Sequence, residues 1–361
     1  MKNKIIFIIM FCICTSFVSA DINLINDISP EEDETISENN IEIKADFTSS
    51  EISSVNFNWE GDDYNYYDNS LILMMNFDNN NEIGETTTFI KDLSIYQNNG
   101  VVTGATWISS DHNGAYEFKN ELSPSLPTDY INIPHKDILN IDSTFTIMTW
   151  VKSYTLSSSL TWQAIISKHS LNRPASLWFH FNKVEIWFNP SGMALASTRE
   201  LQDDTWYHLT ETFDGTTLSL YIDGILDASK TTAVPYLNNM DLYLGQRGDG
   251  QFGLNGAIDE VRIYNRALNA DEIKQQYESN LRKYQSDKWE LNVKKQGLSE
   301  KTYNYDISYI DSSSNQYSTG TTTFKIGEIT PNYIKKETKR WIKGNRKFSK
   351  ILGKMKKYNN R

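Results

Sequence analysis

Hydrophobic and polar residues alternate with a period of two along most of this chain. Examples are "FTIMTWVK" at residues 145–152, "KVEIWF" at 183–188 and "TLSLYIDG" at 217–224, and Gly, Asn, Asp and Ser residues separate such runs. This alternation places every second side chain of a strand in a core, and Asp-Gly between two runs is typical of a tight hairpin. Residues 70–284 are therefore predicted to form a β-sandwich of many short strands.

The same alternation continues on both sides of this domain, in residues 38–69 and 285–327. Ile41, Ile43 and Ala45, for example, share one face of a predicted strand. Neither flank holds enough strands for a sandwich, but together they hold about the number that an immunoglobulin-like sandwich needs. We predict that the two flanks form one small immunoglobulin-like domain into which the larger domain is inserted. Two independent β modules in tandem stay open as the alternative.

One segment has the signature of a helix start. In "GAIDEVRIYNRALNADEI", residues 256–273, β-branched residues continue the strand pattern, and Asn269 is followed three positions later by Glu272. Asn at the N-cap with Glu three residues further on is the capping-box pattern. We therefore expect a strand, a turn and then a helix from Ala270 to about Lys283.

The first residues predict export from the cytoplasm. Residues 1–20 carry two lysines, then an apolar run, then Val-Ser-Ala, which is the pattern of a cleaved signal peptide. An uncleaved membrane anchor stays open, because the apolar run is only slightly shorter than a membrane span. Both cysteines, Cys12 and Cys14, lie in this segment, so the processed chain would hold no disulfide. We expect a secreted, extracellular protein, with attachment to the cell surface left open.

Charge divides the chain into an acidic body and a basic tail. Residues 328–361 hold 12 Lys or Arg and only 2 Asp or Glu, although the formal net charge of the whole chain is -11. The acidic body argues against nucleic acid as a partner of the main domains, and residues 21–37 are predicted to be an acidic, solvated linker. Apolar residues recur every seven positions in the tail, which predicts a basic amphipathic helix. Contact with an anionic membrane or wall polymer and a solvated charged tail both stay open.

These motifs resemble a known family. "GAIDEVRIYNRALNADEI", preceded by "DTWYHLTETFDGTTLSLYIDG" at residues 204–224 and by "GAYEF" and "DYINI" upstream, is similar to the laminin-G-like, concanavalin A-like jelly-roll family. The order of strands before residue 70 and after the jelly roll also looks like that of secreted archaeal surface proteins, which insert such a jelly roll into an immunoglobulin-like domain. The resemblance implies an all-β jelly-roll sandwich used for binding or adhesion.

The resemblance also implies a structural calcium ion, because jelly rolls of this type often hold one where the chain ends meet. Calcium prefers several hard oxygen ligands, and we nominate Asp259, Asp78 and Asp92 as carboxylates with Asn98 as an amide. The alternative for each is a hydrogen-bonding role at a corner of the fold. For a ligand, Trp162 is the best candidate for an exposed platform against which a sugar can stack.

Catalysis has little support in the sequence. A retaining glycosidase on this fold needs two converging carboxylates, whereas Asp259 and Glu260 are adjacent and would point to opposite faces of a strand. Neither a Gly-x-Ser-x-Gly nor a His-Glu-x-x-His motif is present, and His208 is expected to be a buried structural residue. We predict a non-enzymatic protein that recognises a glycan or another surface protein. A glycan-active hydrolase and a purely structural cell-envelope component are the alternatives.

Overall fold

A computed structural model describes residues 25–110, 113–120, 126–141, 143–156, 162–168, 176–189, 192–234 and 238–327. Within these residues, no helix is long and apolar enough to cross a membrane. The predicted signal peptide and the basic tail lie outside the described residues and stay predictions.

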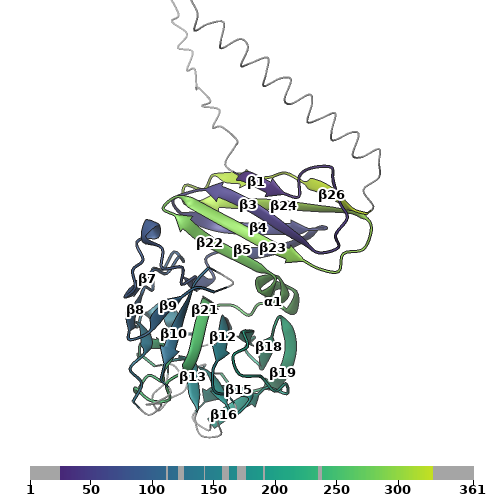
Figure 1. Ribbon diagram of the computed structural model, residues 1–361. Coiled ribbons are helices and arrows are strands. Elements are labelled where there is room, and N and C mark those ends of the chain that lie inside the picture. The colour runs from purple at the N-terminus through teal and green to yellow at the C-terminus, as the bar shows by residue number, and fades with distance from the viewer. Residues whose placement is uncertain are drawn as a thin grey trace, which may run out of the picture.

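The chain folds into two β-sandwiches, with helix α1 (Ala270–Tyr277) between them (Figure 1). The small sandwich has two sheets built from both ends of the described chain. One sheet has the order β1 (Ile25–Ser29), β3 (Ile41–Thr48), β23 (Lys288–Lys295) and β22 (Ser279–Gln285). The other has the order β2 (Glu34–Ile36), β26 (Thr322–Ile326), β24 (Thr302–Asp311), β4 (Ile52–Trp59) and β5 (Asp62–Tyr67), with β25 (Gln316–Ser318) beside β24. Its immunoglobulin-like class stays a prediction.

The jelly roll occupies the chain between β5 and β22 and also has two sheets. The first has the order β19 (Ile225–Thr231), β18 (Thr217–Ile222), β17 (Tyr207–Phe213), β12 (Phe145–Ser153), β21 (Asn255–Tyr264), β10 (Ala115–Lys119) and β9 (Thr106–Ile108), with β6 (Leu71–Met75) also on β21. The second has the order β16 (Gly192–Ala196), β15 (Lys183–Asn189), β14 (Ser176–His180), β13 (Gln163–Ser167), β20 (Leu242–Leu244), β11 (Tyr130–Ile133), β8 (Gly100–Thr103) and β7 (Phe89–Ile90). Two short 3-10 helices, η1 (Asn81–Ile83) and η2 (Asp137–Leu139), lie in its loops. The predicted all-β jelly-roll class is confirmed.

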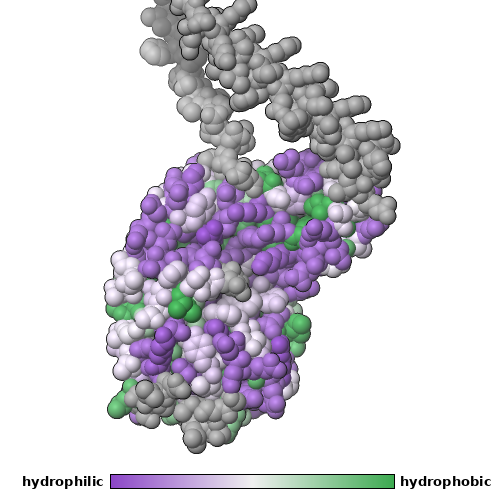
Figure 2. Space-filling model, viewed as in Figure 1, coloured by the Kyte–Doolittle hydropathy of each residue, from purple (hydrophilic) through white to green (hydrophobic). Residues whose placement is uncertain are grey.

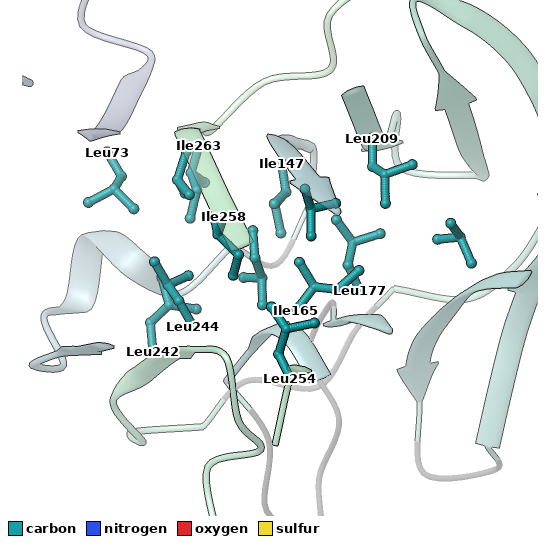
Figure 3. Packing of buried hydrophobic residues seen from close by; sticks show 14 of the residues in the cluster. Leu73, Ile147, Ile165, Leu177, Leu209, Leu242, Leu244, Leu254, Ile258 and Ile263 are labelled. Atoms are coloured by element: carbon teal, nitrogen blue, oxygen red, sulfur yellow. The ribbon is translucent and has the colours of Figure 1, made fainter. Parts of the chain in front are cut away.

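Aliphatic residues from both jelly-roll sheets meet in one core, in which Ile147, Ile258 and Leu209 of the first sheet face Ile165 and Leu177 of the second (Figure 3). This is the result of period-two alternation, since inward residues pack while their neighbours point away from the core. The visible surface of the small sandwich is mostly hydrophilic (Figure 2), as expected when apolar residues fill the core.

Two local predictions were wrong. Helix α1 ends at Tyr277 instead of continuing to about Lys283, because residues 279–285 form strand β22, which pairs with β23. The acidic segment 21–37 is not wholly a solvated linker, since β1 pairs with β3 and β2 pairs with β26. Ile28 and Ile36 pack against the core of the small sandwich. These apolar contacts help to hold the acidic segment on the sheets.

Candidate functional site

Three tryptophans and a histidine gather on the outer face of the second jelly-roll sheet. On β14, Leu177 and Phe179 point into the core, so Trp178 and His180 point outward by alternation. The predicted ligand residue Trp162 precedes β13 and lies beside them, together with Trp187 of β15. We call Trp162, Trp178, His180 and Trp187 the aromatic cluster.

The rings of the aromatic cluster are in direct contact. The Trp162 ring stacks on the His180 ring with centroids 3.5 Å apart and an interplanar angle of 12°. Trp187 meets the Trp162 ring edge-on at 4.8 Å, and Trp178 does so at 6.4 Å. Trp178 is buried at 4% exposure, whereas the other three rings are partly exposed. Trp162, which was predicted to be exposed, is therefore only partly exposed, and its ring packs on His180.

A carboxylate lies within this aromatic surface. Glu185 of β15 accepts a hydrogen bond of 3.1 Å from Trp187 Nε1, and its other oxygen lies 2.9 Å from His180 Nδ1. Because Glu185 is only 8% exposed, these bonds hold two rings of the cluster in fixed positions. Neither Glu185 nor His180 was predicted as a site residue from the sequence. Their signal was present, since both occupy outward positions in the runs "KVEIWF" and "SLWFHF".

A second polar site lies where the jelly roll meets the small sandwich. It consists of Asn76, Asp78, Asp259, Glu260 and Arg262, and we call it the joint. The pairing of β12 with β21 shifts between Met148 and Trp150, and Glu260 has a φ of 49°. This β-bulge places Asp259 and Glu260 together between the inward residues Ile258 and Val261. The expectation that the two carboxylates point to opposite faces was therefore wrong, because it assumed an uninterrupted strand.

Arg262 organises the joint. Its Nη2 lies 3.0 Å from Glu260 Oε2, and its Nη1 donates to Gln276 Oε1 of helix α1 at 2.6 Å. Asn76 donates to Glu260 Oε1 at 2.8 Å and to the carbonyl oxygen of Leu281 in β22 at 2.9 Å. The "DEVR" motif thus ties the closing strand of the jelly roll to the helix and to the small sandwich.

The joint contains more acid than base. Burial, and then the charge of Glu260, raises the pKa of Asp78 to about 8. Burial raises the pKa of Glu260 to about 7, although Arg262 acts against this shift. Burial and the Glu260 charge raise the pKa of Asp259 well above its usual range. A bound cation would lower all three pKa values, because it would stabilise the charged forms.

The predicted metal ligands fall into two groups. Asp78 and Asp259 lie in the joint, where Ser110 Oγ donates to Asp259 Oδ2 at 2.8 Å. Asp78 Oδ1 is buried and has no hydrogen-bond partner among the residues that the structure describes. Asp92 instead organises a turn, because each of its two carboxylate oxygens accepts two hydrogen bonds. The backbone N–H of Asn98 donates one of the four, to Oδ2. In the described parts of the chain, no three His, Cys, Asp or Glu residues form a metal-binding group. Asp78 and Asp259 fit a hard cation better than Asp92 does, and calcium binding stays a prediction.

The geometry of the joint is poorly suited to hydrolysis. Asp259 is fully buried and Glu260 is 5% exposed, so a sugar chain cannot reach between them as glycosidase chemistry requires. A polar pocket of about 140 Å³ lies nearby, lined by residues that include Asn113, Asn280 and Lys294. His208 is 3% exposed and lies against Trp150 and Tyr277, which confirms its expected structural position.

Residues 125–274 match the family described as the concanavalin A-like lectin/glucanases superfamily, also called Laminin_G_3. The predicted family resemblance is confirmed for this stretch. These residues include the aromatic cluster and the "DEVR" motif of the joint. The comparison with curated proteins found no match.

Several solved structures are similar to the chain. The binding domain of Paraclostridial Mosquitocidal Protein 1 shares 17% identity with a TM-score of 0.46, over 67% of this chain and 64% of that one. Domain 4 of the Geobacillus stearothermophilus arabinanase AbnA, in complex with arabinotriose, shares 20% identity with a TM-score of 0.43, over 57% of this chain and 97% of that one. The binding domain of botulinum neurotoxin DC, in complex with rat synaptotagmin II, shares 12% identity with a TM-score of 0.47, over 69% and 73%. TM-scores below 0.5 are too low to support a conclusion about the function of this chain.

Proposed function

We propose that this protein is a non-enzymatic binding protein that recognises a glycan through the aromatic cluster of its jelly roll. The observation that carries the proposal is the stack of Trp162 on His180, with Trp187 edge-on beside it. Indole rings offer broad apolar faces together with an N–H donor, and ligand sites combine such faces with a few fixed polar groups. Glu185 and His180 supply polar groups of that kind here.

A protein ligand is the second candidate, because exposed aromatic side chains also anchor protein interfaces. We further propose that the protein acts outside the cell. The support for this location is the signal-like pattern of residues 1–20 and the absence of cysteine from the rest of the sequence. A role at the cell surface and a contact of the basic tail with an anionic polymer belong to the same proposal.

Binding of the full chain to a glycan array, followed by titration of the glycans that bind, tests the proposal. Trp162→Ala should weaken binding about tenfold or more, since truncation of a central aromatic contact has effects of this size. Trp206→Ala removes a partly exposed indole outside the aromatic cluster and should leave affinity unchanged. Equal affinities of the wild type and Trp162→Ala would refute the site, and binding to proteins alone would favour the second candidate.

We also propose that a calcium ion bound by Asp78 and Asp259 stabilises the joint. The buried, unpartnered Oδ1 of Asp78 and the raised pKa values of both aspartates support this idea. Thermal unfolding with calcium and with a chelator should show a higher Tm with calcium, and Asp259→Asn should abolish the difference. A Tm that does not depend on calcium would overturn the proposal, and an equal response to magnesium would show that the site does not select calcium.

A further inference from the structure

Two phenylalanines beside the aromatic cluster have an unusual backbone conformation. Among the described residues, Phe77, Phe181 and Phe252 have φ values of 57°, 50° and 58°, a region that bulky residues rarely adopt. Phe77 is fully buried. The other two belong to the candidate site, since the Phe181 ring lies 4.2 Å from His180 and the Phe252 ring lies 5.8 Å from Trp178.

Phe181 occupies the tip of the hairpin between β14 and β15. His180 pairs with Lys183, so residues 181 and 182 form a two-residue loop. Such loops favour Gly or Asn where φ is positive. The carbonyl oxygen of Asn182 accepts a hydrogen bond of 2.8 Å from the Leu201 backbone N–H, and Lys183 Nζ donates to the Thr198 carbonyl oxygen at 2.8 Å. These contacts hold the tip in place although its first residue is unsuited to the turn.

Burial does not explain the presence of phenylalanine at this position. Phe181 is 52% exposed, so about half of the stabilisation that a fully buried phenyl ring provides is missing. The turn accounts for the positive φ but not for a phenyl side chain in that conformation, and strained positions of this kind cluster at ligand-contacting sites. The ring also continues the aromatic surface, because Phe181 contacts His180 and His180 stacks on Trp162.

Charged groups around the cluster have partners. Arg247 lies over the Phe252 ring at 4.4 Å and is held by both oxygens of Asp249. Glu185 is bound by ring nitrogens of His180 and Trp187. With Arg247 and Glu185 compensated in this way, the aromatic surface suits the face of an uncharged sugar. Lys183 beside the hairpin tip donates to a carbonyl oxygen and not to a carboxylate.

We propose that Phe181 contacts the ligand and extends the platform beyond Trp162, so that the site takes at least two consecutive sugar units of a neutral oligosaccharide. This inference rests on the proposed function and adds the ligand class and a second contact residue to it. Phe181 binds one unit while Trp162 binds its neighbour, and monosaccharides use the Trp162 side alone.

Phe181→Gly separates a binding role from a structural one. Glycine adopts positive φ without strain, so the Tm of the variant should equal or exceed that of the wild type. Affinity for neutral di- to hexasaccharides should fall about two- to tenfold, the range for loss of one aromatic contact. Affinity for the matching monosaccharides should stay unchanged. Ser314→Gly is the matched control, because Ser314 is an exposed residue of the small sandwich with a φ of 66°, and it should relieve backbone strain without changing binding.

The outcomes distinguish this inference from the function on which it rests. If Phe181→Gly binds oligosaccharides as tightly as the wild type while Trp162→Ala does not, the role of Phe181 is overturned and the glycan site stands. If acidic glycans bind and neutral ones do not, the ligand class is overturned. If the folded wild type binds no glycan on the array, the proposed function fails and the inference fails with it.

Discussion

The two sandwiches bury ionisable side chains in opposite ways. Lys295 of the small sandwich is 6% exposed, and its ammonium group donates to Gln275 Oε1 at 2.6 Å and lies 3.4 Å from Glu278. The rings of Phe57 and Trp59 also lie within 5.5 Å of it. Glu211 of the jelly roll is fully buried between the inward residues Leu209 and Phe213 on β17. Neither of its oxygens has a hydrogen-bond partner among the described residues.

This contrast shows two ways of tolerating a buried ionisable group. Burial lowers the pKa of Lys295, but the Glu278 charge acts in the opposite direction and favours the ammonium form. Burial alone raises the pKa of Glu211 well above its usual range, which favours the protonated form of the carboxyl group. Lys295 of the small sandwich and Glu260 of the joint each lie beside a group of opposite charge, whereas burial of Glu211 in the jelly-roll core favours its neutral form.

Removal of a paired charge at the joint should cause the largest loss of unfolding free energy. Arg262→Met leaves Glu260 buried without its cation, which costs about 3–5 kcal/mol of unfolding free energy in such sites. Arg266→Met is the control, since Arg266 is 31% exposed and pairs with Glu272 at the surface, where a loss of at most about 1 kcal/mol is expected. Urea unfolding measures both. A loss below that of the control would mean that the pair is not important for stability.

Lys295→Ala should have the next largest effect. It removes the cation from between the aromatic rings and leaves a cavity, so we expect a loss of about 2–4 kcal/mol by urea unfolding. Lys295→Met keeps an apolar stem of similar length and should lose less than the alanine variant. Equal losses would show that the charge, and not the packing of the stem, is the main contribution.

Glu211→Leu should act in the opposite direction. Replacement of an unpartnered buried acid by an apolar side chain of similar size should raise the unfolding free energy at neutral pH by about 1–3 kcal/mol. Glu200→Leu, at an exposed position, is the control and should not stabilise. A destabilised Glu211→Leu protein would indicate that the carboxyl group has a partner, such as a buried water molecule.

The last expected change is in the pH dependence of stability. The pKa of Glu211 is raised in the folded state. Below the unfolded pKa both states are protonated, so this pKa difference does not reduce the stability there. As pH rises above that value, only the unfolded state releases the proton, and stability falls by about 1.4 kcal/mol per pH unit until the folded pKa is reached. Glu211→Gln removes this contribution, so its advantage over the wild type should be larger at neutral pH than at mildly acidic pH. An advantage that does not change with pH would contradict this assignment.

The sequence predicted those features that depend on regular alternation. It located the jelly roll and its capped helix, because strand periodicity and capping residues act over a few neighbouring positions. It could not predict the bulge at Glu260, which depends on the pairing of β12 with β21. It also missed β22, because its mostly polar residues could equally continue a helix and become a strand only by pairing with β23. The contact of His180 with Trp162 joins residues of different strands and therefore needed the fold.

The connectivity of the chain has a mechanical consequence. Both ends of the described chain lie in the small sandwich, where β3 pairs with β23 and β4 pairs with β24 (Figure 1). The jelly roll leaves this sandwich after β5 and returns at β22, and Asn76 near the exit donates a hydrogen bond of 2.9 Å to the carbonyl oxygen of Leu281 in β22. A pulling force applied through residues 25 and 327 would pass from strand to strand within the small sandwich. The jelly roll, attached at two neighbouring points, would carry almost none of that load, so its candidate site would keep its geometry while the chain is under tension.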